Sequence, residues 1–229
     1  MVNINDVSQY KKCQKKKYNV WVCMPQIGTC VINKLEQAQV VNRLNGKTYF
    51  TLSELDEMRK NGQNDVYEFL SKNAYIVNEQ KRFVLSGTQG ELWTIDANKL
   101  AKTYTFADGT QITKESLKSK MKTNDAIATM DWQMLESKGA SGETNFAMHV
   151  PIPDIFQVQT AWGSVLNGND PSLGHGKGDF IVCAVNSDGT PNIGDRWIVN
   201  GLIFGDTYDN RGWSDKVINN VNKDNCPNK

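Results

Sequence analysis

The chain has 229 residues, a formal net charge of +1 and 39% hydrophobic residues, among them six Trp. This composition excludes a disordered chain, because it supplies enough apolar side chains for one large hydrophobic core or two small ones. The near-zero net charge gives no overall attraction to nucleic acid or to an anionic membrane. Since no apolar run reaches about 18 residues and no signal peptide is evident, we expect a protein located in the cytoplasm of the producing cell.

The five cysteines indicate neither a zinc site nor a redox motif. Their number is odd and no two have C-x-x-C spacing. Cys23 and Cys183 lie in apolar, strand-like runs, where we expect reduced and buried thiols. We therefore expect no metal site and no cofactor.

Residues 1–17 are predicted to form a basic N-terminal arm. Its five lysines are Lys11, Lys12, Lys15, Lys16 and Lys17. A solvated leader ahead of the first strand is the favoured interpretation, since no aromatic residues alternate with the lysines as in a single-strand nucleic-acid binder. A nucleic-acid contact through these lysines is the alternative.

Residues 18–35 follow as a strand pair broken at Pro25 and Gly28, whereas residues 35–44 fit either a helix turn or a strand. Thr51 and Glu54 form a capping box that predicts a helix ending near residue 61. A second helix is predicted to begin at residue 64. Residues 82–95 then read as a β-hairpin with its turn between Gly87 and Gly90.

A second pair of helices is predicted after this hairpin. Thr113 caps a short helix, and Asn124-Asp125 caps a longer one with Ile127, Met130 and Met134 facing inward and with Gly139 at its end. The small residues of 138–143 mark a boundary, after which residues 146–153, 156–166, 178–185 and 196–204 read as strands.

The pattern predicts an α+β fold made of antiparallel hairpins and two helical pairs. We expect an α+β domain over residues 18–138, a mostly β domain over residues 144–213 and a polar tail over residues 214–229.

One stretch of the sequence occurs a second time in similar form. GELWTIDANKLAKTY (90–104) and GDRWIVNGLIFGDTY (194–208) share four identities and six conservative matches over fifteen positions. The repeat predicts a common strand–turn–strand unit: the Gly and its acidic neighbour close a turn, and the aromatic residues enter the core. These core positions are Trp93, Tyr104, Trp197 and Tyr208.

Phe180-Ile-Val after Gly178-Asp179, followed by Trp197-Ile-Val, Phe204 and Thr207-Tyr208, resembles the small PGDYG-type domains of phages and prophages. Lys177 stands where that motif has Pro, and the earlier copy lacks Gly-Asp before Phe83. The resemblance implies a phage-like origin. It implies no catalytic residues, because the family has no assigned activity.

The candidate catalytic residues are few. A hydrolase would use His175 as general base, oriented by Asp179, with Cys183 or Ser172 as nucleophile and His149 nearby. No nucleophile elbow or P-loop accompanies them, and GHGKGD (174–179) is typical of a flexible loop rather than of a phosphate site.

Three functions follow in order of preference. The first is a non-enzymatic structural or assembly protein of a phage or mobile element, which binds virion components, other proteins or itself through loops and termini. The second is a small hydrolase or nucleotide-acting enzyme that uses His175, Asp179 and His149. The third is a nucleic-acid-binding protein that uses the lysine arm. With the first function, the protein would lie in the cytoplasm of the producing cell and in the virion. With none of the three functions would it bind a membrane.

Overall fold

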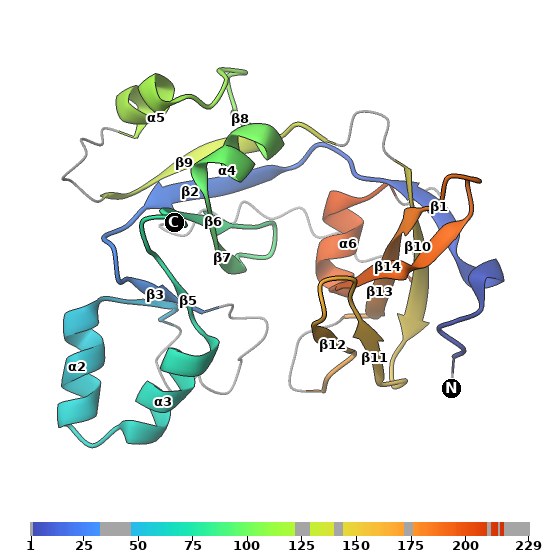
Figure 1. The fold of residues 1–229 in the computed structure, drawn as a ribbon, viewed down its shortest axis with the longest axis horizontal. Helices are drawn as coiled ribbons and strands as arrows, with labels where there is room; N and C mark the ends of the chain where they lie inside the picture. The colour runs from blue at the N-terminus through green and yellow to red at the C-terminus, as the bar shows by residue number, and fades with distance from the viewer. Residues whose placement is uncertain are drawn as a thin grey trace. The chain divides into compact units, whose positions relative to one another are not determined.

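The computed structural model describes residues 2–32, 47–121, 129–139, 144–171, 176–209, 212–214 and 216–217 (Figure 1). The chain divides into two compact units. The terminal unit consists of Met1–Tyr18 and Gly139–Lys223, and the central unit consists of Asn19–Lys138 and Asp224–Lys229. The chain therefore begins in the terminal unit, builds the central unit, and then returns to the terminal unit.

The terminal unit is built on a four-stranded antiparallel sheet with the order β1-β10-β13-β14. A 3-10 helix, η1 (Val7–Gln9), precedes the sheet, and helix α6 (Gly201–Thr207) follows it. A separate hairpin is formed by β11 (Phe156–Gln159) and β12 (Val165–Gly168). The strands of the main sheet are β1 (Lys11–Gln14), β10 (Thr144–Pro151), β13 (Gly178–Val185) and β14 (Pro191–Val199).

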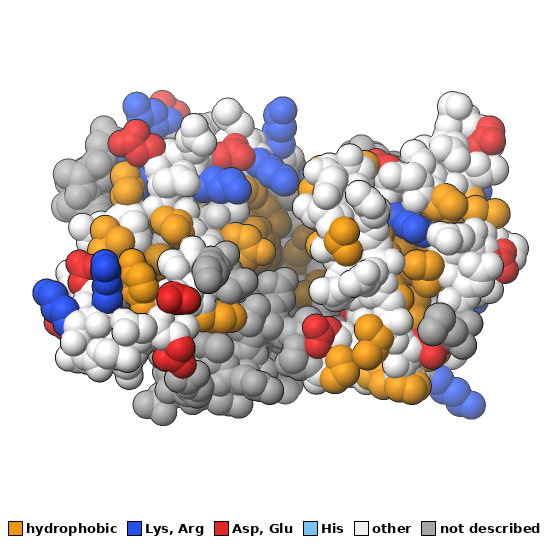
Figure 2. All heavy atoms as spheres, turned by 60° about the horizontal axis from the view of Figure 1, so that its bottom comes forward, with side chains coloured by type: hydrophobic (Ala, Val, Ile, Leu, Met, Phe, Trp, Pro, Cys, Tyr) orange, Lys and Arg blue, Asp and Glu red, His pale blue; other side chains and the backbone are white. Residues whose placement is uncertain are grey.

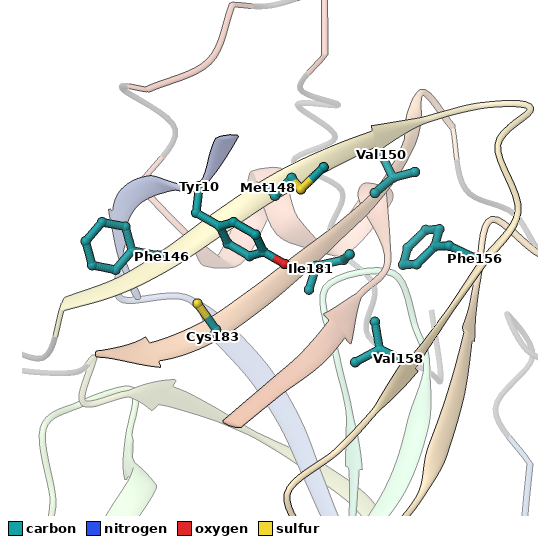
Figure 3. Close-up of a cluster of buried hydrophobic side chains, with 8 residues drawn as sticks. All are labelled: Tyr10, Phe146, Met148, Val150, Phe156, Val158, Ile181 and Cys183. Atoms are coloured by element: carbon teal, nitrogen blue, oxygen red, sulfur yellow. The ribbon is translucent and has the colours of Figure 1, made fainter. Parts of the chain in front are cut away.

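Each face of this sheet carries its own hydrophobic cluster, because successive side chains of a strand point to opposite faces. On one face Phe204 of α6 stacks on Phe180, with ring centroids 3.7 Å apart, and on Tyr208. On the other face Phe156 and Val158 of the small hairpin pack toward the sheet (Figure 3). The sheet residues of this second cluster are Phe146, Met148, Val150, Ile181 and Cys183, and Tyr10, which precedes β1, completes it.

The central unit holds a five-stranded antiparallel sheet with the order β7-β6-β2-β9-β8 and a three-stranded sheet with the order β4-β3-β5. The larger sheet consists of β2 (Asn19–Met24), β6 (Phe83–Ser86), β7 (Leu92–Ile95), β8 (Tyr104–Phe106) and β9 (Thr129–Ser137). The smaller one consists of β3 (Cys30–Val31), β4 (Tyr49–Phe50) and β5 (Tyr75–Ile76). The helices are α2 (Leu52–Lys60), α3 (Asn64–Asn73), α4 (Ala97–Thr103) and α5 (Lys114–Lys120).

The predicted α+β class with antiparallel sheets is confirmed, and several local predictions hold. Thr51 and Glu54 form the predicted capping box at the start of α2, and Thr113 caps α5. The hairpin over residues 82–95 is β6 and β7. These features hold because caps and tight turns are decided by neighbouring residues. The predicted tail over residues 214–229 lies mostly outside the described residues.

Three predictions are wrong. Residues 11–14 are not part of a free arm, because strand β1 pairs with β10 from Lys11↔Ala147 to Gln14↔Thr144. Residues 129–137 form strand β9 instead of a helix, since β2 and β8 pair with its two edges. Residues 201–204, predicted as the end of a strand, belong instead to helix α6, with Asn200 accepting from the amide of Leu202 at its start. The equivalent segment after β7 is helix α4, so that the repeated unit is a strand followed by a helix and not the predicted strand–turn–strand unit. The predicted cap at Asn124-Asp125 lies outside the described residues.

The two large sheets share one plan. The order β14-β13-β10-β1 of the terminal unit corresponds to β7-β6-β2-β9 of the central unit. In each unit the hairpin leads into a helix of seven residues, α6 or α4. A tyrosine follows the helix and pairs back onto the sheet, as Tyr208↔Lys15 in the terminal unit and Tyr104↔Ser137 in the central unit. The likeness in sequence over residues 90–104 and 194–208 is thus matched by a likeness in strand pairing and helix position.

A lysine holds the end of the helix in both units. The side-chain Nζ of Lys16 donates to the carbonyl of Gly205 over 2.7 Å, and that of Lys138 donates to the carbonyl of Ala101 over 2.7 Å. The backbone amides of the same two lysines donate to Thr207 and Thr103. An ammonium group here satisfies a carbonyl of the last helical turn and lies at the negative end of the helix dipole.

The two units differ in the segment that joins the two middle strands of their shared strand order, β2 to β6 in the central unit and β10 to β13 in the terminal unit. Residues 25–82, with β3, β4, α2, α3 and β5, separate β2 from β6 in the central unit. Residues 152–177, with β11 and β12, separate β10 from β13 in the terminal unit. We call these segments the central insertion and the terminal insertion. Both pack on their own unit's sheet, through Val31 and Val77 in the first and Phe156 and Val158 in the second.

Substituting Lys138→Met should lower the free energy of unfolding by about 1 kcal/mol, because one carbonyl at the end of α4 loses its donor and the nearby positive charge. Chemical denaturation of the full chain measures this change. Lys102→Met is the matched control, since Lys102 lies in the last turn of the same helix and is exposed. Equal effects of the two substitutions would contradict the role of the Lys138 contact.

Candidate functional site

A buried polar bridge links the terminal insertion to the sheet. Asn169 and Asp179 are only 4% and 2% exposed. The carboxylate of Asp179 accepts from the amide of Asn169 through one oxygen and from the amide of Gly201 through the other, both over 2.9 Å. The backbone amide of Asp179 in turn donates to Oδ1 of Asn169 over 2.7 Å. Asp179 therefore holds the start of α6 and the end of the insertion at once.

The amide group of Asn169 completes the bridge from the other side. Its Nδ2 donates to the carbonyls of Val150, Pro151 and Asp154 at 2.9–3.2 Å. Asn169 has a φ of +53°, in the left-handed region that asparagine tolerates better than most residues. The network fixes the bend at the end of β10. No sequence pattern singles out Asn169, since the tract NGND (167–170) is typical of an ordinary turn.

His149 lies beside this bridge. Its Nε2 donates to the carbonyl of Lys177 over 3.0 Å, and its ring lies 5.0 Å from that of Phe180. Burial lowers the pKa of His149 below its ordinary value, while the Lys177 carbonyl and the Asp179 carboxylate oppose that shift. The imidazole is therefore neutral at pH 7. A Cβ on Gly178 would lie 2.3 Å from the carbonyl of Val150, which explains the glycine ahead of Asp179.

Cys183 lies on the opposite face of the sheet from His149. In the pairing of β10 with β13, His149 faces Phe180 while Cys183 faces Phe146, and these two positions alternate between the faces. Cys183 is fully buried, and burial raises the pKa of its thiol to about 11. Asp179 thus lies close enough to His149 to influence its pKa, whereas Cys183 lies on the opposite face of the sheet from His149. His175 and Ser172 lie outside the described residues.

The lysines predicted as a nucleic-acid contact are engaged within the terminal unit. Lys11 donates through Nζ to the carbonyl of Gly212 over 2.9 Å, and its ammonium lies over the ring of Trp213. Lys12 lies over Phe146, and Lys15 lies over Tyr18. With Lys16 at the end of α6, these contacts give the basic segment a structural role in the strand that it forms.

The repeated aromatic residues occupy matching places in the two units. Trp93 pairs with Leu85 and Trp197 with Val182, so that each tryptophan lies opposite a buried residue of the preceding strand. Tyr104 and Tyr208 are buried, and burial raises the pKa of Tyr208. The turn predicted at Gly194-Asp195 is wrong, because these residues lie within β14, whereas Gly90 does lie in the β6–β7 turn. The two tyrosines thus belong to the core, Trp197 is half-buried against the cluster around Phe180, and Trp93 is half-buried.

The exposed apolar side chains are concentrated in the two insertions. Ten large hydrophobic residues are exposed among those that the structure describes, and eight of them belong to the insertions. Ile27, Leu52, Tyr75 and Ile76 lie in the central insertion, and Ile152, Ile155, Trp162 and Val165 lie in the terminal one. Figure 2 shows hydrophobic side chains reaching the surface in patches among polar ones. The sequence pattern does not predict which of these apolar side chains are exposed, because their burial depends on which elements of the fold pack against them.

An open pocket lies on the terminal insertion. Its lining combines an apolar wall with polar groups, and consists of Ile155, Phe156, Gln157, Asn167, Asp170 and Pro171. Within the described parts of the chain, no group of three or more His, Cys, Asp or Glu residues could hold a metal ion. No described helix is long and apolar enough to span a membrane.

Asn169→Ala should lower the free energy of unfolding by about 3 kcal/mol, because it leaves buried partners without hydrogen bonds and places alanine in the left-handed region. Asn169→Gly should cost less, since glycine accepts that backbone conformation. Urea denaturation of the full chain measures both. Asn167→Ala, at an exposed position of the same strand end, is the control. An effect as small as that of the control would contradict a supporting role for the bridge.

Raising the pH should destabilise the fold through Cys183. The folded thiol has a pKa of about 11 against an ordinary value of 9.0, so the unfolded chain loses this proton first. The stabilisation is present below pH 9.0 and is lost as the pH rises toward about 11. Denaturation midpoints at pH 8 and pH 10.5 should therefore differ more for the wild type than for Cys183→Ala. Identical pH dependence in the two proteins would show that Cys183 contributes nothing.

The resemblance to PGDYG-type domains concerns residues that the structure places in equivalent hairpins and helices, β13-β14-α6 and β6-β7-α4. The likeness between these segments is internal to the chain, and the wider resemblance stays a prediction. No protein-family model, curated protein or solved structure matches this chain.

Proposed function

We propose that the protein is a non-enzymatic interaction or structural protein of a phage or other mobile element, and that it binds other proteins through its two insertions. One observation carries the proposal: eight of the ten exposed large hydrophobic side chains among the described residues lie in the insertions. Contiguous apolar surface on a soluble protein is typical of a binding surface, whereas scattered single residues need no explanation.

The organisation of the two units supports the same function. The shared part of each unit consists of sheet strands, a hairpin and a capped helix, whose matched residues are buried or hold the backbone. Loops and insertions on a rigid scaffold commonly carry the binding residues of a protein. The insertions differ in length and structure, so that one scaffold presents two different surfaces. The resemblance to PGDYG-type domains supports an origin in a phage or prophage.

The candidate residues of an enzyme have structural roles in the described part of the chain. Both carboxylate oxygens of Asp179 accept backbone amides, and Nε2 of His149 donates to a backbone carbonyl. A general base needs a nitrogen or oxygen that is free to accept a proton from the substrate, and in His149 that atom is Nδ1, because Nε2 carries the proton that it donates. The hydrogen bonds of Asp179 favour a supporting role for that residue, and the position of Cys183 on the opposite face of the sheet from His149 gives the interaction function preference over the hydrolase.

Affinity capture with matched surface variants tests the proposal. A tagged full-length chain is expressed in the producing cells, and its partners are identified by mass spectrometry there and in purified particles. Trp162→Ser with Val165→Ser should weaken binding of a partner at the terminal insertion at least about tenfold. Tyr75→Ser with Ile76→Ser tests the central insertion in the same way.

The control variant is Val7→Ser with Met134→Ser, which changes the two large hydrophobic residues that are exposed outside the insertions in the described part of the chain. Circular dichroism establishes that each variant is folded. The proposal fails if no partner is enriched over an untagged strain, or if the control weakens binding as much as the insertion variants do. Virion proteins among the partners would support the phage role, and host proteins alone would place the function outside the particle.

A further inference from the structure

The first strand of each repeat belongs to the sheet of the other repeat. In chain order the first repeat is β1, β2, β6, β7, α4 and β8, and the second is β9, β10, β13, β14, α6 and Tyr208. Yet β1 pairs with β10 of the second repeat, and β9 pairs with β2 of the first. Consecutive strands usually pair with each other, and here neither first strand pairs with the strand that follows it.

The exchange is reciprocal at the level of single residues. Strand β1 lies beside β10 and ends at Gln14, and the next residue, Lys15, pairs with Tyr208 after helix α6 in an isolated bridge. Strand β9 lies beside β2 and ends at Ser137, which pairs with Tyr104 after helix α4. The next residue in each case, Lys16 or Lys138, donates its amide and its ammonium to the end of that helix. One set of contacts is thus made twice, each time between two repeats.

We infer that the chain is a covalently joined, strand-exchanged pair of one repeated unit, in which each repeat carries an acceptor edge for the first strand of the other. The acceptor edge of the terminal unit is β10 together with the end of α6. The strand that pairs with this edge has an apolar residue at the buried position of Cys13 and a lysine three residues later, at the position of Lys16. The partner that this edge fits is a second copy of the repeat.

Exchange of an identical element between copies is a well-known way in which a small domain forms a dimer. A tandem copy of such a domain would keep the exchange within one chain. This explains why the terminal unit is assembled from residues at both ends of the sequence, with Met1–Tyr18 and Gly139–Lys223 on either side of the central unit. It also explains why the boundaries between the two units lie at Tyr18/Asn19 and Lys138/Gly139, shortly after the end of each first strand.

Cutting the full chain between its repeats tests the inference. A protease recognition sequence is inserted between Asp108 and Gly109, in the turn that closes with the Gly109 amide bonded to the Phe106 carbonyl. The cut yields fragments 1–108 and 109–229, and each unit then contains strands from both. The fragments should elute as one complex by size exclusion and separate only in denaturant. Separation into two folded fragments without denaturant overturns the inference.

Proline in an exchanged strand shows whether strand pairing holds the fragments together, because proline removes a backbone donor. Cys13→Pro in β1 or Leu135→Pro in β9, which occupy equivalent buried positions, should raise the dissociation constant of the cut complex at least about tenfold. Val7→Pro is the matched control, since Val7 is the first residue of η1 and follows an extended residue. Wild-type association of the cut Cys13→Pro and Leu135→Pro proteins overturns the inference.

Hydrogen exchange of the cut wild-type protein decides the matter if the proline variants do not fold. The amides of Lys12–Gln14 and of Leu135–Ser137 should stay protected after cutting, as in the uncut chain. Loss of protection in β1 while β10 and β13 remain protected would mean that β1 is not held by the other repeat, and would also overturn the inference.

Discussion

The pairing of β1 with β10 and of β9 with β2 is the constraint on which the rest of the structure depends. These pairings place Lys16 and Lys138 at the ends of α6 and α4, where their ammonium groups reach the carbonyls of Gly205 and Ala101. The helices lie at the ends of hairpins whose inner strands pair with β10 and β2. Without the two first strands, the terminal sheet would lose its edge strand β1, the central sheet would lose the strand β9 that joins β8 to β2, and each helix would lose its C-terminal donor.

The repeated scaffold separates stability from binding. Its matched residues include the buried tyrosines Tyr104 and Tyr208, the helix caps and the two lysines, which hold the hairpin and the helix in place. The parts that were not repeated carry most of the exposed apolar residues. A scaffold with local caps and paired strands tolerates insertion at a loop, because the ends of the insertion are already held close together. The polar bridge of Asn169 and Asp179 does this for the terminal insertion.

The Gly178-Asp179 pair of the second repeat has a structural explanation. Gly178 allows the carbonyl of Val150 to approach, and Asp179 accepts the first amide of α6. An aspartate at this position accepts a hydrogen bond from an amide that has no acceptor within the helix. The Gly-Asp pair before this apolar strand therefore supports the backbone at the start of β13 and at the start of α6.

Local features were predictable from the sequence because they depend on near neighbours: the capping box at Thr51, the cap at Thr113, the hairpin over residues 82–95 and the likeness of residues 90–104 to residues 194–208. Only the tertiary structure decided that residues 129–137 are a strand and residues 201–207 a helix, since β2 and β8 supply the partners of the first and Asp179 and Lys16 hold the ends of the second. It also decided the partner of each first strand. A four-residue strand such as β1 carries no mark of its partner, because backbone hydrogen bonds are the same for every acceptor edge.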